Sequence, residues 1–281
     1  MSNNTRILYV EAEKRDFIQK FLLANPNYWL RPEDGKIDFQ RRLTPDGPWM
    51  YVRPVPNMNC NLWHRILFDI IHGKQRVPIP CQECWKVVLQ PRTLEELFAT
   101  YFMQLTLDRP CKCGTEGDRD NTSKLYGAYW YNKSREAGQE CWEAVYDELA
   151  KGITYEREIM GCPVKVKFDL EGKGMPNLIL KRACTEYEQW CGPSDKWGWD
   201  AKQAETEAIC NDIFVSDVIT PIPAEHMKAH LFVRWIHRAF QWGDETYKMF
   251  TNGNDLFTKV VTYHDPTRGA KKEKKDGKKR S

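Results

Sequence analysis

The sequence predicts an α+β fold with a small mixed sheet, a cysteine-rich metal region and a helical C-terminal third. Three observations support this prediction: short apolar runs with strand-like alternation, longer segments with apolar residues at helical spacing, and two closely spaced cysteine pairs. The chain has 281 residues, of which 41% are hydrophobic and 12% aromatic, which is enough to form a packed core. This length suits one large domain or two ordinary ones.

Strands and helices alternate in the first half of the chain. Four runs rich in aliphatic and aromatic residues are expected to be strands: residues 7–10, 49–53, 85–89 and 125–131. Four segments with apolar residues three and four positions apart are expected to be helical: residues 17–22, 59–73, 93–105 and 134–150. Asn59 or Asn61 is expected to cap the second of these helices, and residues 132–134 to form the turn and cap of the fourth.

The second half predicts a hairpin followed by helices. Residues 164–170 alternate between apolar and polar, residues 171–174 resemble a turn, and residues 177–181 are expected to return as the second strand. Lys165, Lys167 and Asp169 then share one solvated face. Two helices are expected at about 200–219 and 224–242. We therefore divide the chain into 1–160, 161–265 (which could belong to the same domain) and 266–281.

The charge of the chain is uneven. Between Arg268 and Arg280 there are eight Lys or Arg residues and two acidic ones, whereas the rest of the chain has 34 basic and 37 acidic residues. Residues 266–281 contain no apolar side chain larger than alanine, so we expect a disordered basic tail. Such tails attract polyanions without reading their sequence.

The sequence also predicts a compartment. No apolar run approaches the ~20 residues that a membrane span requires, and the polar N-terminus lacks the apolar core of a signal peptide. Without such a signal, the ten cysteines are expected to be thiols or metal ligands. We therefore expect a cytoplasmic protein in a reducing environment that makes no membrane contact.

Four cysteines have the spacing of metal ligands. Cys81 and Cys84 form one pair and Cys111 and Cys113 a second; a proline precedes each pair and a glycine follows the second. Four thiolates close the tetrahedral coordination of zinc, so the expected Zn²⁺ is structural. Iron also fits these ligands. Two alternative ligands lie upstream: Cys60 and His64.

Aromatic and basic residues interleave near residues 112–135. Tyr129 and Tyr131 share one side of the expected strand, with Trp130 on the other. Rings beside cations suit base stacking with phosphate neutralisation; rings that only cover a neighbouring helix are the alternative. The basic candidates for nucleic-acid contact are Lys112, Arg119, Lys124, Lys133, Arg135, Lys271, Lys272, Lys274, Lys275, Lys278, Lys279 and Arg280.

The leading hypothesis is a zinc-stabilised accessory protein that binds nucleic acid. The first alternative is an enzyme that uses the polar loop 184–197 with a carboxylate or a histidine. A pocket that combines Glu186, Glu188, Asp195 and Lys196 with a C-terminal histidine would favour it, and Cys184 is a possible nucleophile. His226, His230 and His237 share one helical face and are the candidates for that histidine. The second alternative is a protein–protein adaptor or assembly component. The sequence contains no phosphate-binding loop or nucleophile elbow and leaves the oligomeric state open.

Overall fold

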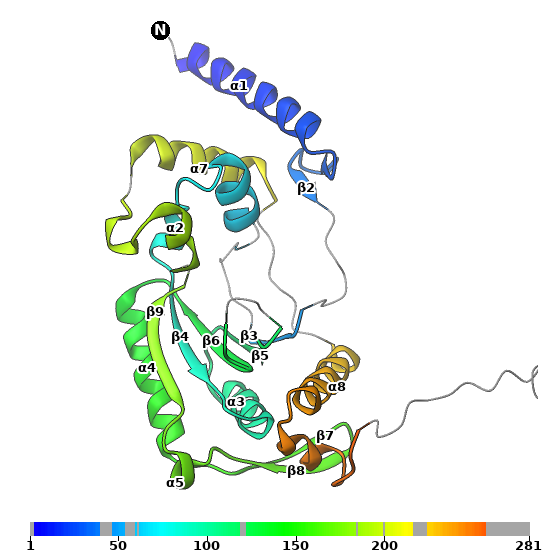
Figure 1. The fold of residues 1–281 in the computed structure, drawn as a ribbon. Helices are drawn as coiled ribbons and strands as arrows, with labels where there is room; N and C mark the ends of the chain where they lie inside the picture. Colours follow the sequence, from blue (N-terminus) through cyan, green and yellow to red (C-terminus); the bar gives the residue numbers. More distant parts are fainter. Residues whose placement is uncertain are drawn as a thin grey trace, which may run out of the picture.

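A five-stranded antiparallel sheet lies at the centre of the protein (Figure 1). The computed structural model describes residues 3–39, 47–53, 60, 62–118, 122–183, 185–198, 200–215 and 224–256. The strands, in spatial order, are β3 (Trp49–Arg53), β5 (Cys111–Thr115), β6 (Tyr126–Asn132), β4 (Trp85–Gln90) and β9 (Asn177–Arg182). The fold is α+β, as expected, but this sheet is antiparallel throughout rather than mixed.

Two helices cover one side of this sheet, which we call the covered face. α3 (Leu94–Thr106) packs against β3, β5 and β6, and α4 (Arg135–Ala150) packs against β4, β6 and β9. Ser134 caps α4, as expected, and Thr93 caps α3: each side chain accepts a hydrogen bond from a backbone N–H in the first turn. The other expected caps, Asn59 and Asn61, lie outside the described residues.

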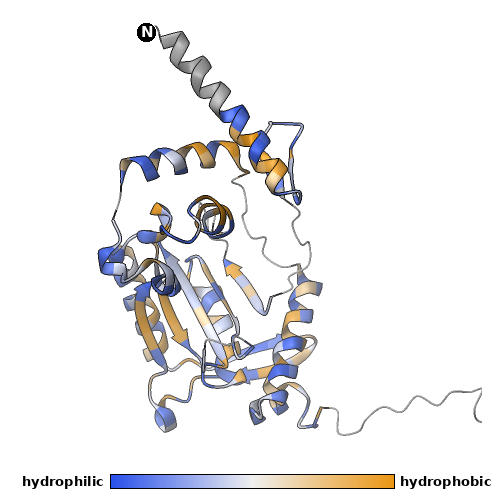
Figure 2. Cartoon of the chain, turned by 45° about the horizontal axis from the view of Figure 1, so that its top comes forward, coloured by the Kyte–Doolittle hydropathy of each residue, from blue (hydrophilic) through white to orange (hydrophobic). Residues whose placement is uncertain are grey.

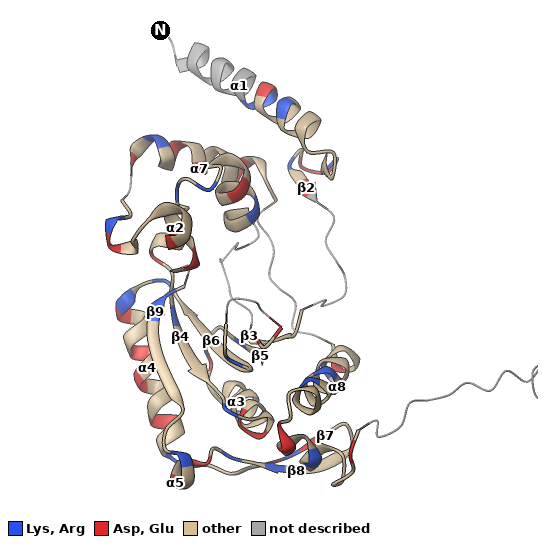
Figure 3. Cartoon of the chain, in the orientation of Figure 1, with Lys and Arg blue, Asp and Glu red and all other residues tan. Residues whose placement is uncertain are grey.

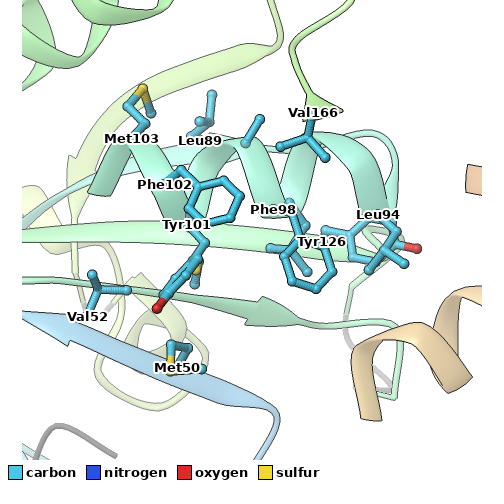
Figure 4. Packing of buried hydrophobic residues seen from close by; sticks show 14 of the residues in the cluster. Met50, Val52, Leu89, Leu94, Phe98, Tyr101, Phe102, Met103, Tyr126 and Val166 are labelled. Atoms are coloured by element: carbon cyan, nitrogen blue, oxygen red, sulfur yellow. The ribbon is translucent and has the colours of Figure 1, made fainter. Parts of the chain in front are cut away.

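The main hydrophobic core lies between the covered face and these helices. Trp130 of β6 and Phe98 of α3 are both fully buried there. In Figure 4, Tyr101 points from α3 toward Met50 and Val52 of β3. Because β6 buries Trp130 on this side, Tyr129 and Tyr131 project from the opposite side of the sheet, as the alternation predicted.

The C-terminal third is helical, as expected. α7 (Ala201–Ile213) is followed by α8 (Glu225–Gln241) and the short η4 (Glu245–Phe250). α8 packs against α3, β3 and β5. The Asp244 carboxylate accepts hydrogen bonds at 2.6 Å from the Leu94 N–H and from the Tyr126 hydroxyl, which attaches this third to α3 and β6.

A second hydrophobic cluster lies beyond the end of the sheet. It joins α1 (Asn3–Ala24), β2 (Ile37–Phe39), η1 (Leu62–Ile71, a π-helix) and α7. Figure 2 shows apolar residues where α1 and α7 approach one another. The remaining elements are β1 (Tyr28–Leu30, paired with β2), α2 (Ile79–Gln82), α5 (Leu170–Lys173), η2 (Thr185–Tyr187), α6 (Glu188–Cys191) and η3 (Ser194–Lys196).

One expected strand and one expected pairing of strands are wrong. Residues 7–10 belong to α1 and form no strand. The expected hairpin 164–181 does not form, because β8 (Cys162–Val166) pairs back with β7 (Tyr155–Ile159) through a two-residue turn at Met160 and Gly161, both with positive φ. The short helix α5 then leads the chain away to β9, which pairs with β4. The exposure of Lys165 and Lys167 is confirmed.

The pairing of strands crosses the boundary proposed at residue 160. β7 and β8 lie on opposite sides of that residue, and β9 extends a sheet built from earlier strands. Strand pairing therefore links residues on both sides of that boundary, and the division into domains stays a prediction. The tail 266–281 lies outside the described residues. Among the helices that the structure describes, none has the length and apolar character needed to cross a membrane.

Candidate functional site

The four cysteines predicted to bind metal do not lie together. Cys111 and Cys113 both point from β5 into the main core, since alternate residues of a strand share one face. Cys81 packs in a separate apolar cluster beside Phe68, and Cys84 in a third. Among the described residues, no three His, Cys, Asp or Glu side chains are close enough to hold a metal ion.

The register of the sheet shows how far apart the pairs are. Cys111 is level with Val87 two strands away, and Cys84 lies three residues beyond Val87. At ordinary strand spacing the Cα atoms of Cys84 and Cys111 are about 14 Å apart. Thiolate sulfurs on one zinc ion lie within about 4 Å of one another. The four thiols therefore do not fit one tetrahedral ion, and zinc or iron binding stays a prediction from spacing alone.

The two alternative ligands do not complete the site. The imidazole Nδ1 of His64 lies 2.8 Å from the Tyr187 hydroxyl, and its ring stacks on Phe68 and Tyr187. Cys60 is exposed. Neither residue joins a cluster of three metal-ligating side chains in the described part of the chain.

We expect Cys111 and Cys113 to resist thiol reagents in the native protein at pH 8. Burial raises the pKa of the Cys111 thiol to about 12 and that of Cys113 well above its usual value. Because the folded pKa is raised, the stabilisation from the neutral thiols is complete below about pH 9 and is lost as the pH rises toward 12. Aromatic disulfide titration followed by peptide mapping measures which thiols react.

Cys60 is the internal reference in that titration, because it is exposed and should react at pH 8 without unfolding. Rapid modification of Cys111 and Cys113 at pH 8, accompanied by release of zinc to a chromogenic chelator, would contradict the buried-thiol arrangement and restore the metal prediction.

The side of the sheet opposite the covered face carries a different constellation, centred on Lys112. Lys112 lies on β5 directly between Tyr51 of β3 and Tyr129 of β6. Its ammonium group is 5.3 Å and 5.8 Å from the centroids of these two rings. Trp49 and Tyr131 contribute the diagonal rings at 4.7 Å and 5.6 Å. Four aromatic rings thus surround one cation, each within cation–π range.

Two further lysines extend this constellation across the sheet. The ammonium of Lys86 on β4 lies 5.1 Å from the Tyr129 ring, so two cations border that ring. Lys181 on β9 is the direct cross-strand partner of Lys86. Figure 3 shows basic residues at the ends of β4 and β9 near α2. We call the set Trp49, Tyr51, Lys86, Lys112, Tyr129, Tyr131 and Lys181 the lysine–aromatic face.

Lys124 adjoins this face. Burial lowers its pKa, the Glu116 carboxylate raises it, and the nearby Lys181 ammonium lowers it further. A lysine that senses both groups lies close to them in space. The neighbourhood therefore contains four lysines and the buried Glu116. The exposed Glu188 is a second carboxylate near Lys181: hydrogen bonds from Ser194 and the charge of Lys181 lower its pKa.

Glu116 holds Tyr129 in place beneath the face. The Tyr129 hydroxyl donates a hydrogen bond to the Glu116 carboxylate, which is only 3% exposed. Both groups lie over Gly127, where an added Cβ would be 2.9 Å from the Glu116 carboxyl carbon and 3.1 Å from the Tyr129 hydroxyl. Tyr129 is itself buried, whereas Trp49, Tyr51 and Tyr131 are half-buried. The ring of Tyr129 therefore supports the face rather than forming its outer surface.

The other predicted nucleic-acid residues lie elsewhere. Lys133 is exposed just after β6, and Arg135 stacks on Trp85 at the edge of the covered face, 5.8 Å from its centroid. Arg119 and the basic tail lie outside the described residues. Sequence reasoning missed Trp49, Tyr51, Lys86 and Lys181. The sequence did show polar residues at alternating positions of apolar strands. It did not show the order of the strands in the sheet, which brings these residues together.

The residues of the alternative enzyme site are dispersed. Glu186, Glu188, Asp195 and Lys196 are all exposed, and His226 and His230 lie on the outer side of α8. Cys191 is half-buried with its thiol 3.5 Å from the Lys74 carbonyl, and Cys184 lies outside the described residues. A groove of about 350 Å³ lies between α3, β7 and α8, and none of the loop 184–197 lines it.

The lysine–aromatic face thus brings together aromatic and basic side chains from all five strands of the sheet. It combines planar rings, cations and one buried carboxylate, which suits a ligand that is both aromatic and anionic. Compared with known proteins, the chain matches no family model, and no curated protein or solved structure shows significant similarity to it.

Proposed function

We propose that the protein binds single-stranded nucleic acid on the lysine–aromatic face. The observation that carries this proposal is the position of the Lys112 ammonium within 6 Å of four ring centroids, with Lys86 beside one of the same rings. Unpaired bases stack on aromatic side chains, and lysines neutralise the adjoining phosphates. Paired bases do not expose their faces, so a single strand is the form that this surface accepts.

The arrangement also assigns roles within the face. The half-buried rings of Trp49 and Tyr51 offer edges and faces to bases, whereas the buried Tyr129 fixes the spacing of Lys86 and Lys112. Tyr131 packs against Cys84 and Ala183 and supports the face from below. Lys86 and Lys181 are neighbours on adjacent strands with like charges. Two neighbouring ammonium groups complement the charge of a phosphate, so phosphate is the ligand group expected beside them.

We expect a fluorescently labelled single strand to bind with a dissociation constant on the order of micromolar at low salt, weakening steeply as salt is added. The double change Lys86→Gln/Lys181→Gln should lower the slope of log K against log salt by about 1.4, since each lost phosphate contact contributes about 0.7. Tyr51→Leu should weaken binding about tenfold by removing one stacking ring. Fluorescence anisotropy over a salt series measures both effects.

The control is Lys165→Gln/Lys167→Gln, which also removes two lysines, both exposed, in β8 and just after it. It should leave the affinity within about twofold if binding is confined to the proposed face. Deleting residues 267–281 should lower the salt slope without abolishing the effect of the Lys86 and Lys181 changes. Undetectable binding by the full chain at low salt would overturn the proposal.

A further inference from the structure

The outward side of α8 is a second donor-rich surface. His226, His230 and Arg234 follow one another at intervals of four residues and are all exposed. His237 and Gln241 continue the same stripe toward the end of the helix. The opposite side buries Leu231, Phe232, Trp235, Ile236 and Ala239 in the main core.

The charge of α8 is one-sided. Its single acidic residue is Glu225, in the first turn, where it forms an ion pair with Lys228 at 2.6 Å. Beyond that turn the exposed stripe presents N–H donors from histidine, arginine and glutamine, with Val233 as the apolar residue among them. Figure 3 shows Lys and Arg along this helix. A surface of this composition complements a polyanion.

The stripe is continuous with the lysine–aromatic face. The Arg234 guanidinium donates a hydrogen bond to the Gly47 carbonyl at 3.2 Å, and the Trp235 indole donates to the Pro48 carbonyl at 2.8 Å. The next residue is Trp49, whose ring lies over Lys112. The donor stripe of α8 therefore begins at the edge strand where the lysine–aromatic face ends.

We propose that the outward side of α8 binds the phosphate backbone of the same strand whose bases stack on the lysine–aromatic face. This inference rests on the proposed function. The row from Lys112 to Lys181 crosses three strand intervals, or about 14 Å, whereas the 17 residues of α8 add a path of about 25 Å. A short oligonucleotide occupies the sheet alone, and a longer one reaches His230 and Arg234.

The test compares single strands of about five and about fifteen nucleotides, lengths within the range that single-strand-binding modules cover. The full chain and the variant Arg234→Gln are measured by anisotropy over a salt series. We expect Arg234→Gln to weaken binding of the longer strand about fivefold and to lower its salt slope by about 0.7. Binding of the shorter strand should remain unchanged.

Two variants separate phosphate contact from damage to the fold. His226→Gln/His230→Gln alters only exposed side chains and should also weaken binding of the longer strand without changing binding of the shorter one. Lys228→Gln changes a cation on the other side of the same helix and should leave the affinity for both strands unchanged. If Arg234→Gln weakens binding of both strand lengths equally, or weakens binding of neither, the α8 inference is overturned. If wild-type protein binds neither strand, the proposed function fails as well, so the two failures are distinguishable.

Discussion

Replacing Gly114 with alanine should destabilise the protein by about 3 kcal/mol, because the new methyl group has no space on β5. A Cβ built on Gly114 overlaps the Pro48 carbonyl oxygen and lies 3.0 Å from its carbonyl carbon and 3.2 Å from Trp49 Cα. These neighbours are backbone atoms, so no side-chain rotation relieves the overlap. β3 must move away from β5.

That movement breaks a second interaction. The indole N–H of the fully buried Trp235 donates to the same Pro48 carbonyl at 2.8 Å. Displacing Pro48 leaves this donor without its partner in the core, which adds the cost of an unsatisfied buried group. Because β3 also carries Trp49 and Tyr51, the substitution should weaken nucleic-acid binding together with stability.

Urea denaturation and thermal melting measure the effect, with an expected fall in melting temperature on the order of 6 °C or more. The control is Gly198→Ala, since an added Cβ there meets nothing within 4 Å and the residue is exposed. That change should be neutral or stabilising by about 0.5 kcal/mol. A Gly114→Ala protein as stable as wild type would show that Pro48 does not pack over β5.

Local signals in the sequence predicted most elements of this fold. The helix cap at Ser134, the alternation of residues 125–131 and the helices beginning near residues 200 and 224 were all recognisable, because each depends on neighbours within a few residues. The strand expected at residues 7–10 was wrong because it, too, was predicted from neighbouring residues alone. A four-residue apolar run has no helical signature of its own, and the structure includes it in a 22-residue helix.

The cysteine pairs show how one spacing fits two structures. A C-x-C pair suits a metal knuckle, but it also has the period of a β-strand, which directs Cys111 and Cys113 into the same core. Gly114 was interpreted as part of a metal turn, whereas in the structure it permits the close approach of Pro48. Recognising residues 111–115 as a strand would have favoured the second interpretation.

The candidate site was only half predictable for a related reason. Tyr129 and Tyr131 share a face by alternation within one expected strand, and Lys112 lies within twenty residues of both in the sequence. Trp49 and Tyr51 join them only because β3 pairs with β5, and Lys181 only because β9 pairs with β4. Strand order is a property of the whole chain, so no local pattern specifies it.

Replacing Glu207 with alanine should cost about 3 kcal/mol and detach α7 from its neighbours. The Glu207 carboxylate is 3% exposed and accepts hydrogen bonds from the Ile79 N–H at 3.0 Å and the Gln203 amide at 2.7 Å. His72 Nε2 lies 2.9 Å from the same carboxylate. Truncation removes the acceptor that these three groups share. Polar groups that lose their partner inside the fold lower the free energy of unfolding, because water does not fully replace that partner.

Glu205→Ala is the matched control, because Glu205 lies on the same helix two residues earlier and is exposed. Its effect should stay within about 0.5 kcal/mol. Glu207→Gln should be intermediate, since the amide oxygen still accepts one hydrogen bond while its NH₂ group opposes the remaining donors. Hydrogen exchange locates the damage: amides of α7 and α2 should lose protection before those of β4 and β6. Uniform loss across the sheet would instead mean that α7 is an integral part of the main core.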